Sequence, residues 1–359
     1  MRVFAFHLLN DYSGSPKVLS QLLKGWVKND IEVNMVTCKG RIGFLSDIEG
    51  VNYHYYNYKF AENKWIRLFN LTLSQLIVFF KFWNKIQKDD IIYVNTVLPF
   101  GAAFLGKLKR CRVIYHVHET TMKPPILKKF LFGIAKWAAN DVIYVSNYLS
   151  KQEPFAKAKT HIIYNAIEDE FYEKAKLNRE ISDNPKNALL VCSLKEYKGV
   201  NEFVQLAKLN SKYNFRLVVN AVQAEIDEYF KNTELPNNLE IFETQTNLHP
   251  FYKWADVILN LSKPDGWVET FGLTIIEGMA YGLPAIIPPV GGITELVIEG
   301  ENGFLIDSRN GVDLNLVLNT LFQETLNYKQ MTSNSLFKIE NFSETVFYSQ
   351  NIKVLKNLI

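Results

Sequence analysis

The chain has 359 residues, of which 48% are hydrophobic and 21% charged. This composition is typical of globular proteins that bury sizeable cores, and the length predicts about two domains. Neither a solenoid repeat nor a low-complexity tract is present, which excludes those architectures. The net charge of +3 is uneven, because residues 1–165 carry +12 and the remainder −9. The basic half predicts an anionic partner, namely a membrane surface, a lipid phosphate or a nucleic acid; a simple solubility asymmetry is the alternative.

Short apolar runs alternate with helix-period segments through the first half of the chain. Val3–Leu9 predicts a first strand that ends in a turn-rich loop, and residues 18–27 predict a helix with one apolar face. Further strands are predicted at Glu32–Thr37, Ile91–Val94, Val113–His118 and Asp141–Ser146. Short buried strands between helices indicate a parallel, doubly wound sheet.

A second set of strands follows a charged, Asn-rich stretch, Glu168–Lys186, which has no clear period and predicts an interdomain linker. These strands are predicted at Ala188–Ser193, Arg216–Asn220, Leu239–Phe242, Val257–Ser262 and Pro284–Ile287. We expect residues 1–167 and 168–340 to form two domains, with a helix at about 341–359 packing back on the first. Two such sheets facing across a cleft bind two substrates from opposite sides.

Three features bear on the cellular setting. The cysteines Cys38, Cys111 and Cys192 are far apart and odd in number, which favours a reduced, cytoplasmic protein. Residues 1–9 lack the cleavage site of a signal peptide. The apolar stretch Leu68–Trp83 is interrupted by polar residues and is too short for a transmembrane helix. A soluble or peripheral protein is therefore predicted.

The strongest local motif runs from Glu269 to Glu277 and opens a predicted helix that ends at Tyr281-Gly282. A helix N-terminus after a strand offers backbone N–H groups and a positive dipole end to a phosphate. Two glutamates eight residues apart on a helix are separated by about 12 Å. That exceeds the roughly 5–9.5 Å of a glycosidase pair and favours bracketing a long ligand. Two solvated helix glutamates are the alternative.

This segment resembles the paired-glutamate motif of the family-4 retaining glycosyltransferases, which have the GT-B fold of two Rossmann-like domains. The resemblance implies that Glu269 lies near the donor sugar and that Glu277 holds ribose hydroxyls of a nucleotide sugar. It also implies that backbone amides of Phe271, Gly272 and Leu273 contact the sugar or the diphosphate. Retention of configuration, no metal and no cofactor are implied as well, and a UDP-sugar is favoured over a GDP-sugar.

Residues 190–199 resemble the strand, loop and helix with which the family clamps the diphosphate. Lys198 matches the family's lysine, but Ser193 stands where an arginine is usual and Cys192 where a glycine is usual. Lys195 is the candidate substitute for the missing cation. A lysine is the residue expected there, because cleavage of a sugar–phosphate bond leaves negative charge on the diphosphate. A surface lysine at a helix start is the alternative.

The resemblance extends more weakly to both ends of the chain. Gly14 matches a glycine-rich loop that approaches the diphosphate and the acceptor, and His118 matches a histidine that faces the cleft. His116 lies on the same strand face, so either histidine is a candidate. The Gly-Gly turn at 291–292 also matches. Thr246, in the loop 243–249, is a candidate for recognition of the base.

Two segments of the basic half are rich in aromatic residues. The stretch Lys123–Trp137 predicts a basic amphipathic helix, and Trp65–Lys88 mixes cations with aromatic residues. Such segments lie on anionic membrane surfaces, or pack in cores with their lysines reaching water. We therefore expect a peripheral protein on the cytoplasmic face of a membrane. Nucleic acid is not expected, because no binding module is present.

The resulting hypothesis is a metal-independent hexosyltransferase. It would move a sugar from a nucleotide diphosphate sugar to a glycan or lipid-linked glycan acceptor in cell-surface polysaccharide synthesis. Residues 1–167 would bind the acceptor and residues 168–340 the donor. A nucleotide-sugar epimerase on the same fold and a non-catalytic sugar-nucleotide-binding subunit are the alternatives. A dehydrogenase is disfavoured, because no GxGxxG follows the first strand.

Overall fold

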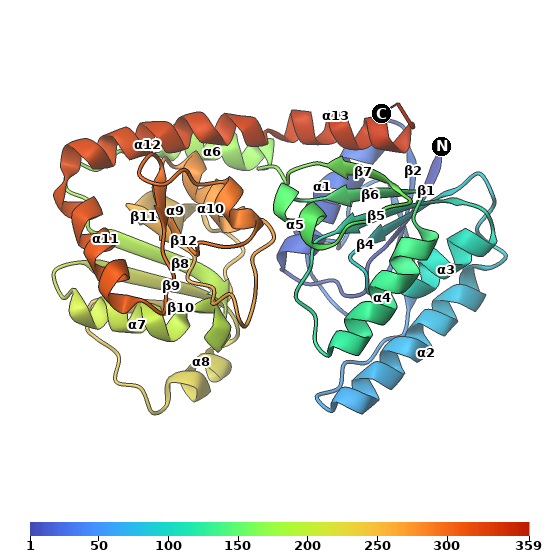
Figure 1. Cartoon of the computed structure of the whole chain (residues 1–359), viewed down its shortest axis with the longest axis horizontal. Coiled ribbons are helices and arrows are strands. Elements are labelled where there is room, and N and C mark those ends of the chain that lie inside the picture. Colours follow the sequence, from blue (N-terminus) through green and yellow to red (C-terminus); the bar gives the residue numbers. More distant parts are fainter. Residues whose placement is uncertain (359) are drawn as a thin grey trace. The chain divides into compact units, whose positions relative to one another are not determined.

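The computed structural model describes residues 1–358 and divides into two compact α/β units. The first unit contains Met1–Tyr164 together with the residues from Thr345 onward, and the second contains Asn165–Glu344. Each unit is built on one parallel sheet (Figure 1). The fold predicted from the sequence, with two parallel Rossmann-like sheets, is confirmed.

The sheet of the first unit has the strand order β3-β2-β1-β4-β5-β6-β7. Its strands are β1 (Arg2–Phe6), β2 (Glu32–Cys38), β3 (Val51–Tyr56), β4 (Ile91–Asn95), β5 (Arg112–Val117), β6 (Asp141–Tyr144) and β7 (Lys159–Ile162). Its helices are α1 (Gly14–Val27), α2 (Lys64–Phe82), α3 (Phe100–Leu108), α4 (Pro125–Ala138), α5 (Asn147–Gln152) and α13 (Glu344–Leu355).

The sheet of the second unit has the order β10-β9-β8-β11-β12-β13. Its strands are β8 (Asn187–Ser193), β9 (Asn214–Asn220), β10 (Leu239–Phe242), β11 (Val257–Leu259), β12 (Ala285–Ile287) and β13 (Gly303–Leu305). Its α-helices are α6 (Asp169–Asn178), α7 (Val200–Leu209), α8 (Gln223–Phe230), α9 (His249–Trp254), α10 (Leu273–Ala280), α11 (Gly311–Gln323) and α12 (Thr325–Ile339). The 3₁₀ helices are η1 (Glu196–Lys198), η2 (Gly292–Glu295) and η3 (Glu340–Phe342).

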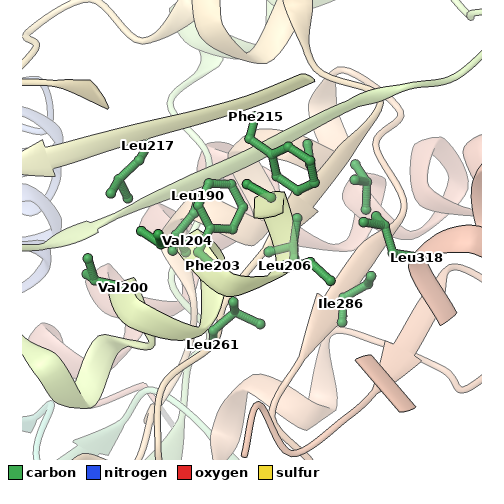
Figure 2. Close-up of a cluster of buried hydrophobic side chains, with 14 of the residues drawn as sticks. Leu190, Val200, Phe203, Val204, Leu206, Phe215, Leu217, Leu261, Ile286 and Leu318 are labelled. Carbon is green, nitrogen blue, oxygen red and sulfur yellow. The ribbon is translucent and has the colours of Figure 1, made fainter. Parts of the chain in front are cut away.

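The core of the second unit shows why these segments fold as they do. Along α7 the apolar residues Val200, Phe203, Val204 and Ala207 recur at helical spacing and are all buried. They pack against β8, β9 and β11, where Phe203 meets Phe215 edge-to-face at 5.4 Å between ring centroids (Figure 2). This packing fixes the start of α7, and the start of α7 positions the site described below.

In the first unit, α1 packs on the sheet, and the C-terminal helix α13 approaches it at Gly25. The rings of Trp26 on α1 and Tyr93 on β4 lie 4.8 Å apart, and both are buried. A Cβ at Gly25 would come within 2.8 Å of the Tyr348 ring, so the small residue allows α13 to approach α1. Arg112 adds a hydrogen bond of 2.9 Å to the carbonyl of Leu355.

Three expectations from the sequence were wrong or incomplete. The predicted linker contains helix α6, whose irregular apolar pattern buries only Ala175. Strand β3 was not among the predicted strands, and it is only partly buried. The apolar stretch thought too short to span a membrane extends back to Lys64, and by length and composition alone α2 is able to cross one.

Candidate active site

Each sheet has one place where the strand order reverses, and in such sheets ligands bind beyond the carboxyl ends of the strands at that place. In the first unit the reversal lies between β1 and β4, and in the second between β8 and β11. The segments that follow these four strands begin at His7, Thr96, Leu194 and Asn260. They contain most of the predicted site residues.

In the second unit, Lys198 and Glu269 form a partly buried ion pair. The Lys198 Nζ lies 2.5 Å from the Glu269 Oε1, and each side chain is 15% exposed. The same carboxylate oxygen accepts hydrogen bonds from the Ser262 hydroxyl at 2.7 Å and the Asn260 amide at 3.4 Å. The Trp267 indole N–H lies 3.4 Å from the other oxygen. The segments that follow β8 and β11 thus meet at one carboxylate.

The local backbone explains this convergence. Gly199, between η1 and α7, has φ +76°, and a Cβ there would lie 2.3 Å from Leu261. Only glycine allows this close approach, which brings Lys198 beside the chain that leaves β11. Gly291 has φ +113°, and a Cβ there would lie 2.4 Å from the carbonyl oxygen of Glu269. The Gly-Gly turn noted in the sequence therefore packs against the backbone of the Glu269 loop.

The electrostatics keep this site ionised. Burial raises the pKa of Glu269, but the Lys198 charge and the hydrogen bonds from Lys198, Ser262 and Asn260 outweigh burial and hold that pKa below its ordinary value. The Lys198 ammonium also lies 5.1 Å from the centroid of the Trp267 ring, which stacks on Tyr197. The alternative of a solvated surface lysine does not describe Lys198.

Helix α10 begins at Leu273, directly after the Glu269 loop. Its N-cap, Gly272, has no side chain to satisfy the first amides, and Phe271 beside it is buried. Helix starts leave their first N–H groups without intrahelical partners and carry a partial positive charge. Of the predicted amides, those of Gly272 and Leu273 belong to this helix start, where an anion is stabilised, and that of Phe271 lies one residue before it.

Glu277 and Glu269 occupy different kinds of structure, which corrects one premise of the sequence argument. Glu269 lies in the loop before α10 and not on the helix, so the separation of about 12 Å along a helix does not apply. Glu277 lies on α10, is 5% exposed, and accepts a hydrogen bond of 2.7 Å from the Tyr252 hydroxyl. The alternative of two solvated helix glutamates is therefore wrong.

The remaining predicted residues of the second unit lie at the end of β8, before η1 and in the loop after β10. Ser193 ends β8 and is partly exposed, and Lys195 is exposed at the start of η1. Thr246 is exposed in the loop between β10 and α9. Cys192 stands where the family has glycine. Burial raises the pKa of its thiol to about 12, while the charges of Lys198 and Glu269 act on it in opposite directions. It is therefore a thiol at neutral pH.

In the first unit, His118 belongs to a buried polar chain at the carboxyl end of the sheet. Its Nε2 lies 2.8 Å from the side-chain oxygen of Asn95, which is fully buried at the end of β4. The Asn95 amide nitrogen donates to the Ser15 carbonyl at 3.1 Å and lies 3.1 Å from His7 Nδ1. The Ser15 carbonyl can only accept, so Asn95 presents its oxygen to His118, and His118 Nε2 carries the proton.

These histidines are held neutral. Burial lowers the pKa of His7 to about 4 and that of His116 to about 3. Burial, then the neighbouring His116 and His7, lower the pKa of His118 well below its ordinary value. His116 is fully buried and its Nδ1 lies 2.9 Å from the Tyr93 hydroxyl, so of the two candidates only His118 is partly exposed.

Two further features distinguish this edge of the sheet. Glu119 accepts backbone N–H groups of Val97 at 2.9 Å and His118 at 3.2 Å, and burial raises its pKa to about 7. Thr96 has φ +69°, a strained conformation for a β-branched residue. Gly14 begins α1 after the loop that leaves β1 and is exposed.

Sequence reasoning missed Asn95, Ser262, Asn260 and Tyr252, which hold the candidate residues in place. Asn95, Asn260 and Ser262 lie at or just after predicted strands, which was an available signal. Tyr252 carried no signal, because its contact with Glu277 joins two helices.

Two family models match consecutive parts of the chain. The model described as Glycosyltransferase Family 4 matches residues 12–171, and the model described as Glycosyl transferases group 1 matches residues 172–336. The chain belongs to the family-4 glycosyltransferases. It is accordingly a retaining glycosyltransferase that uses a nucleotide sugar, and the predicted family is confirmed.

Relatives and solved structures agree with this assignment. The N-acetyl-alpha-D-glucosaminyl L-malate synthase of Bacillus anthracis is 26% identical over 61% of this chain and 61% of its own length. A 41.2 kDa protein in the cps region of Klebsiella pneumoniae is 24% identical over 72% of this chain and 75% of its own. Anabaena Alr3699/HepE in complex with UDP-glucose matches at TM-score 0.80 and 19% identity, over 99% of this chain and all of that one, which shows the shared GT-B fold.

Proposed function

We propose that this family-4 glycosyltransferase moves a hexose-type sugar from a UDP-sugar to a glycan or lipid-linked glycan acceptor in cell-surface polysaccharide synthesis. The relative in a cps region supports the pathway, and the UDP-glucose complex of the Anabaena neighbour supports the donor. The reaction would take place in the cytoplasm, with the enzyme peripheral on the membrane. Residues 1–167 would bind the acceptor and residues 168–340 the donor.

The observation that carries the proposal is the Lys198–Glu269 pair beside the start of α10. In this assignment Lys198 and the amides of Phe271 to Leu273 stabilise the charge that develops on the leaving diphosphate. Glu269, kept ionised, accepts hydrogen bonds from hydroxyls of the donor sugar. The ion pair holds both groups in place before the donor binds.

The other residues complete the assignment. Glu277 would accept hydrogen bonds from the ribose hydroxyls, with Tyr252 orienting its carboxylate. Ser193 and Lys195 would lie beside the diphosphate, and Thr246 would contact the base. In the first unit, Gly14 would allow backbone to approach the diphosphate. His118 would sit near the reacting centre as a neutral imidazole, with its N–H donated to Asn95 and its other ring nitrogen an acceptor.

A nucleotide screen tests the donor. Ligands that bind the native state raise its melting temperature by mass action. UDP and UDP-hexoses should raise Tm by several degrees more than GDP and GDP-hexoses at equal concentration. A larger shift with the guanine nucleotides would overturn the choice of base. Product formed without an acceptor would indicate an epimerase, and tight binding without turnover on any glycan would indicate a non-catalytic subunit.

Replacement of Glu277 tests the site. Glu277→Ala should abolish transfer and lower UDP affinity about 10- to 100-fold, since hydrogen bonds to charged groups are worth about 1.5–3 kcal/mol. Tyr252→Phe is the matched control, because it removes only the 2.7 Å hydrogen bond to the carboxylate. We expect Tyr252→Phe to keep most of the activity. An unchanged rate of transfer in Glu277→Ala would contradict the assignment of Glu277 to the donor site.

A further inference from the structure

Helix α2 of the first unit has an unusual outer face. Its buried residues Leu71, Ser74, Gln75, Val78 and Phe82 face the unit. The opposite side of a surface helix is normally polar, but here it carries large apolar side chains that are exposed. They are Phe69, 65% exposed, Leu73, 45%, Leu76, 50%, and Phe80, 72%. An exposed apolar stripe of this kind indicates that something covers it.

The apolar surface continues over the two neighbouring helices. Phe79 of α2 lies 5.9 Å from Phe104 of α3, and Phe104 lies 5.3 Å from Trp137 of α4, measured between ring centroids. Phe130 and Trp137 on α4 are about half exposed. The three helices lie next to one another on the first unit (Figure 1). We call this surface the α2–α4 face.

The charge of the α2–α4 face selects one kind of partner. Helices α2, α3 and α4 together carry seven lysine and arginine residues and no aspartate or glutamate. Lysines also lie over its aromatic rings, with Lys109 at 5.4 Å from Trp83 and Lys107 at 5.9 Å from Trp137. A second copy of the chain is disfavoured, because a two-fold interface would bring the same cations together. An anionic lipid surface satisfies both the apolar stripe and the cations.

A hollow beside α2 offers a place for a lipid headgroup. Its volume is about 390 Å³, and its lining includes Lys39, Tyr55, Asn57 and Lys81. A second hollow of about 380 Å³ shares Lys39 and Asn57 with it and adds Lys59. Lysines around a concave surface next to an exposed apolar helix match the phosphate and the acyl chains of an anionic lipid.

Helix α2 is held to the unit too firmly to cross a membrane. Phe82 packs edge-to-face on Phe6 of β1 at 5.7 Å, and the Gln75 side chain accepts the Gly101 N–H at 3.2 Å. Insertion across a bilayer would remove these buried contacts. The helix lies in the plane of an interface instead, with its apolar stripe toward the lipid.

We propose that the α2–α4 face docks on an anionic lipid bilayer, with the acyl region against Phe69 and Phe80 and the headgroups against Lys39 and Lys59. The proposal rests on the peripheral membrane location given in the proposed function and names the surface that provides it, but it does not depend on the donor or the acceptor. It concerns a surface of the first unit, and vesicle binding reads it without any turnover.

The test is co-sedimentation of the full chain with vesicles. One set is phosphatidylcholine alone, and in the other roughly one third of the lipid is phosphatidylglycerol. The protein should sediment with the anionic vesicles at least about tenfold better, and raising the salt should weaken binding as screening increases. Absence of sedimentation with anionic vesicles at low salt would overturn the proposal.

Two double variants separate the apolar and charged contributions. Phe69→Ser with Phe80→Ser, and Lys39→Glu with Lys59→Glu, should each lower vesicle binding at least about fivefold. The matched apolar control is Leu326→Ser with Phe337→Ser on α12, since these side chains are 87% and 74% exposed. The charge control is Lys208→Glu on α7, which is also exposed.

Folding and oligomeric state are checked on the same samples. The variants should keep the wild-type Tm and UDP binding, because the changed residues are exposed in the first unit. Equal loss of binding in the controls would overturn the proposal. So would a wild-type dimer that the Phe69/Phe80 variant dissociates in the absence of vesicle binding, because the face would then be an interface between copies.

Discussion

The two polar sites of the molecule differ in charge. In the second unit, Lys198 and Glu269 are ionised partners, and the lysine keeps the pKa of the glutamate low. In the first unit, burial keeps His7, His116 and His118 neutral and raises the pKa of Glu119 to about 7. In the proposed assignment, the charged edge of the second unit binds the diphosphate of the donor. The other is prepared to offer hydrogen bonds without adding charge.

The largest effect is expected when the cation of the Lys198–Glu269 pair is removed. Lys198→Met removes the cation but keeps an unbranched side chain, and should lower kcat about 10²–10³-fold, the usual loss for one donor that stabilises developing charge. The matched control is Lys263→Met, since Lys263 is 16% exposed and pairs with Glu202 at 2.8 Å. The control should stay within a few-fold of wild type. Equal losses in both variants would show that general positive charge, and not the pair, is what matters.

The second prediction concerns Glu119 in the first unit, and the measured quantity is the free energy of unfolding. The pKa of Glu119 is about 7 in the folded chain and about 4.5 unfolded, so between these values the native state binds more protons than the unfolded state. Its contribution to stability is therefore present below pH 4.5 and is lost as pH rises through 7. Relative to Glu119→Gln, the unfolding free energy of wild type should fall by about 3 kcal/mol from pH 4.5 to 8.

Denaturant titrations of both proteins across this pH range measure the difference. The Gln variant is the reference, because it retains the size of the side chain but does not titrate. A difference independent of pH would mean that Glu119 stays ionised, and the first unit would then resemble the second.

The third prediction introduces a charge into the histidine site of the first unit. Asn95→Asp places a carboxylate 2.8 Å from His118 Nε2, which should raise the pKa of that histidine, because a nearby anion favours the imidazolium. We expect kcat to fall about 10-fold at neutral pH and to decline further toward acid, because protonation removes the neutral imidazole that the assignment places near the reacting centre. The measurement is the pH profile of kcat for both proteins. A wild-type profile at a uniformly lower rate would assign Asn95 a purely structural role.

The pH profile needs a folding control because Asn95 also bonds Ser15 and lies beside His7. Asn95→Ala removes the same contacts without adding charge. A profile shift in the Asp variant that the Ala variant lacks identifies the effect as electrostatic.

Much of the fold could be predicted from the sequence. Strands β1, β2, β4, β8 and β9 are apolar runs bounded by turns, and the structure places them within a few residues of the prediction. Such strands can be predicted because a strand covered on both faces is hydrophobic throughout. Strand β3, only partly buried, and α6, with one buried residue, lack that pattern and were not predicted.

By itself, the sequence determined the family, the parallel sheets and the identity of the candidate residues, since these rest on local patterns and ordered motifs. Only the tertiary structure decided their partners. It placed Glu269 in a loop against Lys198, Glu277 against Tyr252, and His118 against Asn95. The physical reason is that each contact joins segments from different strands or helices, and chain spacing carries no record of which carboxyl ends meet.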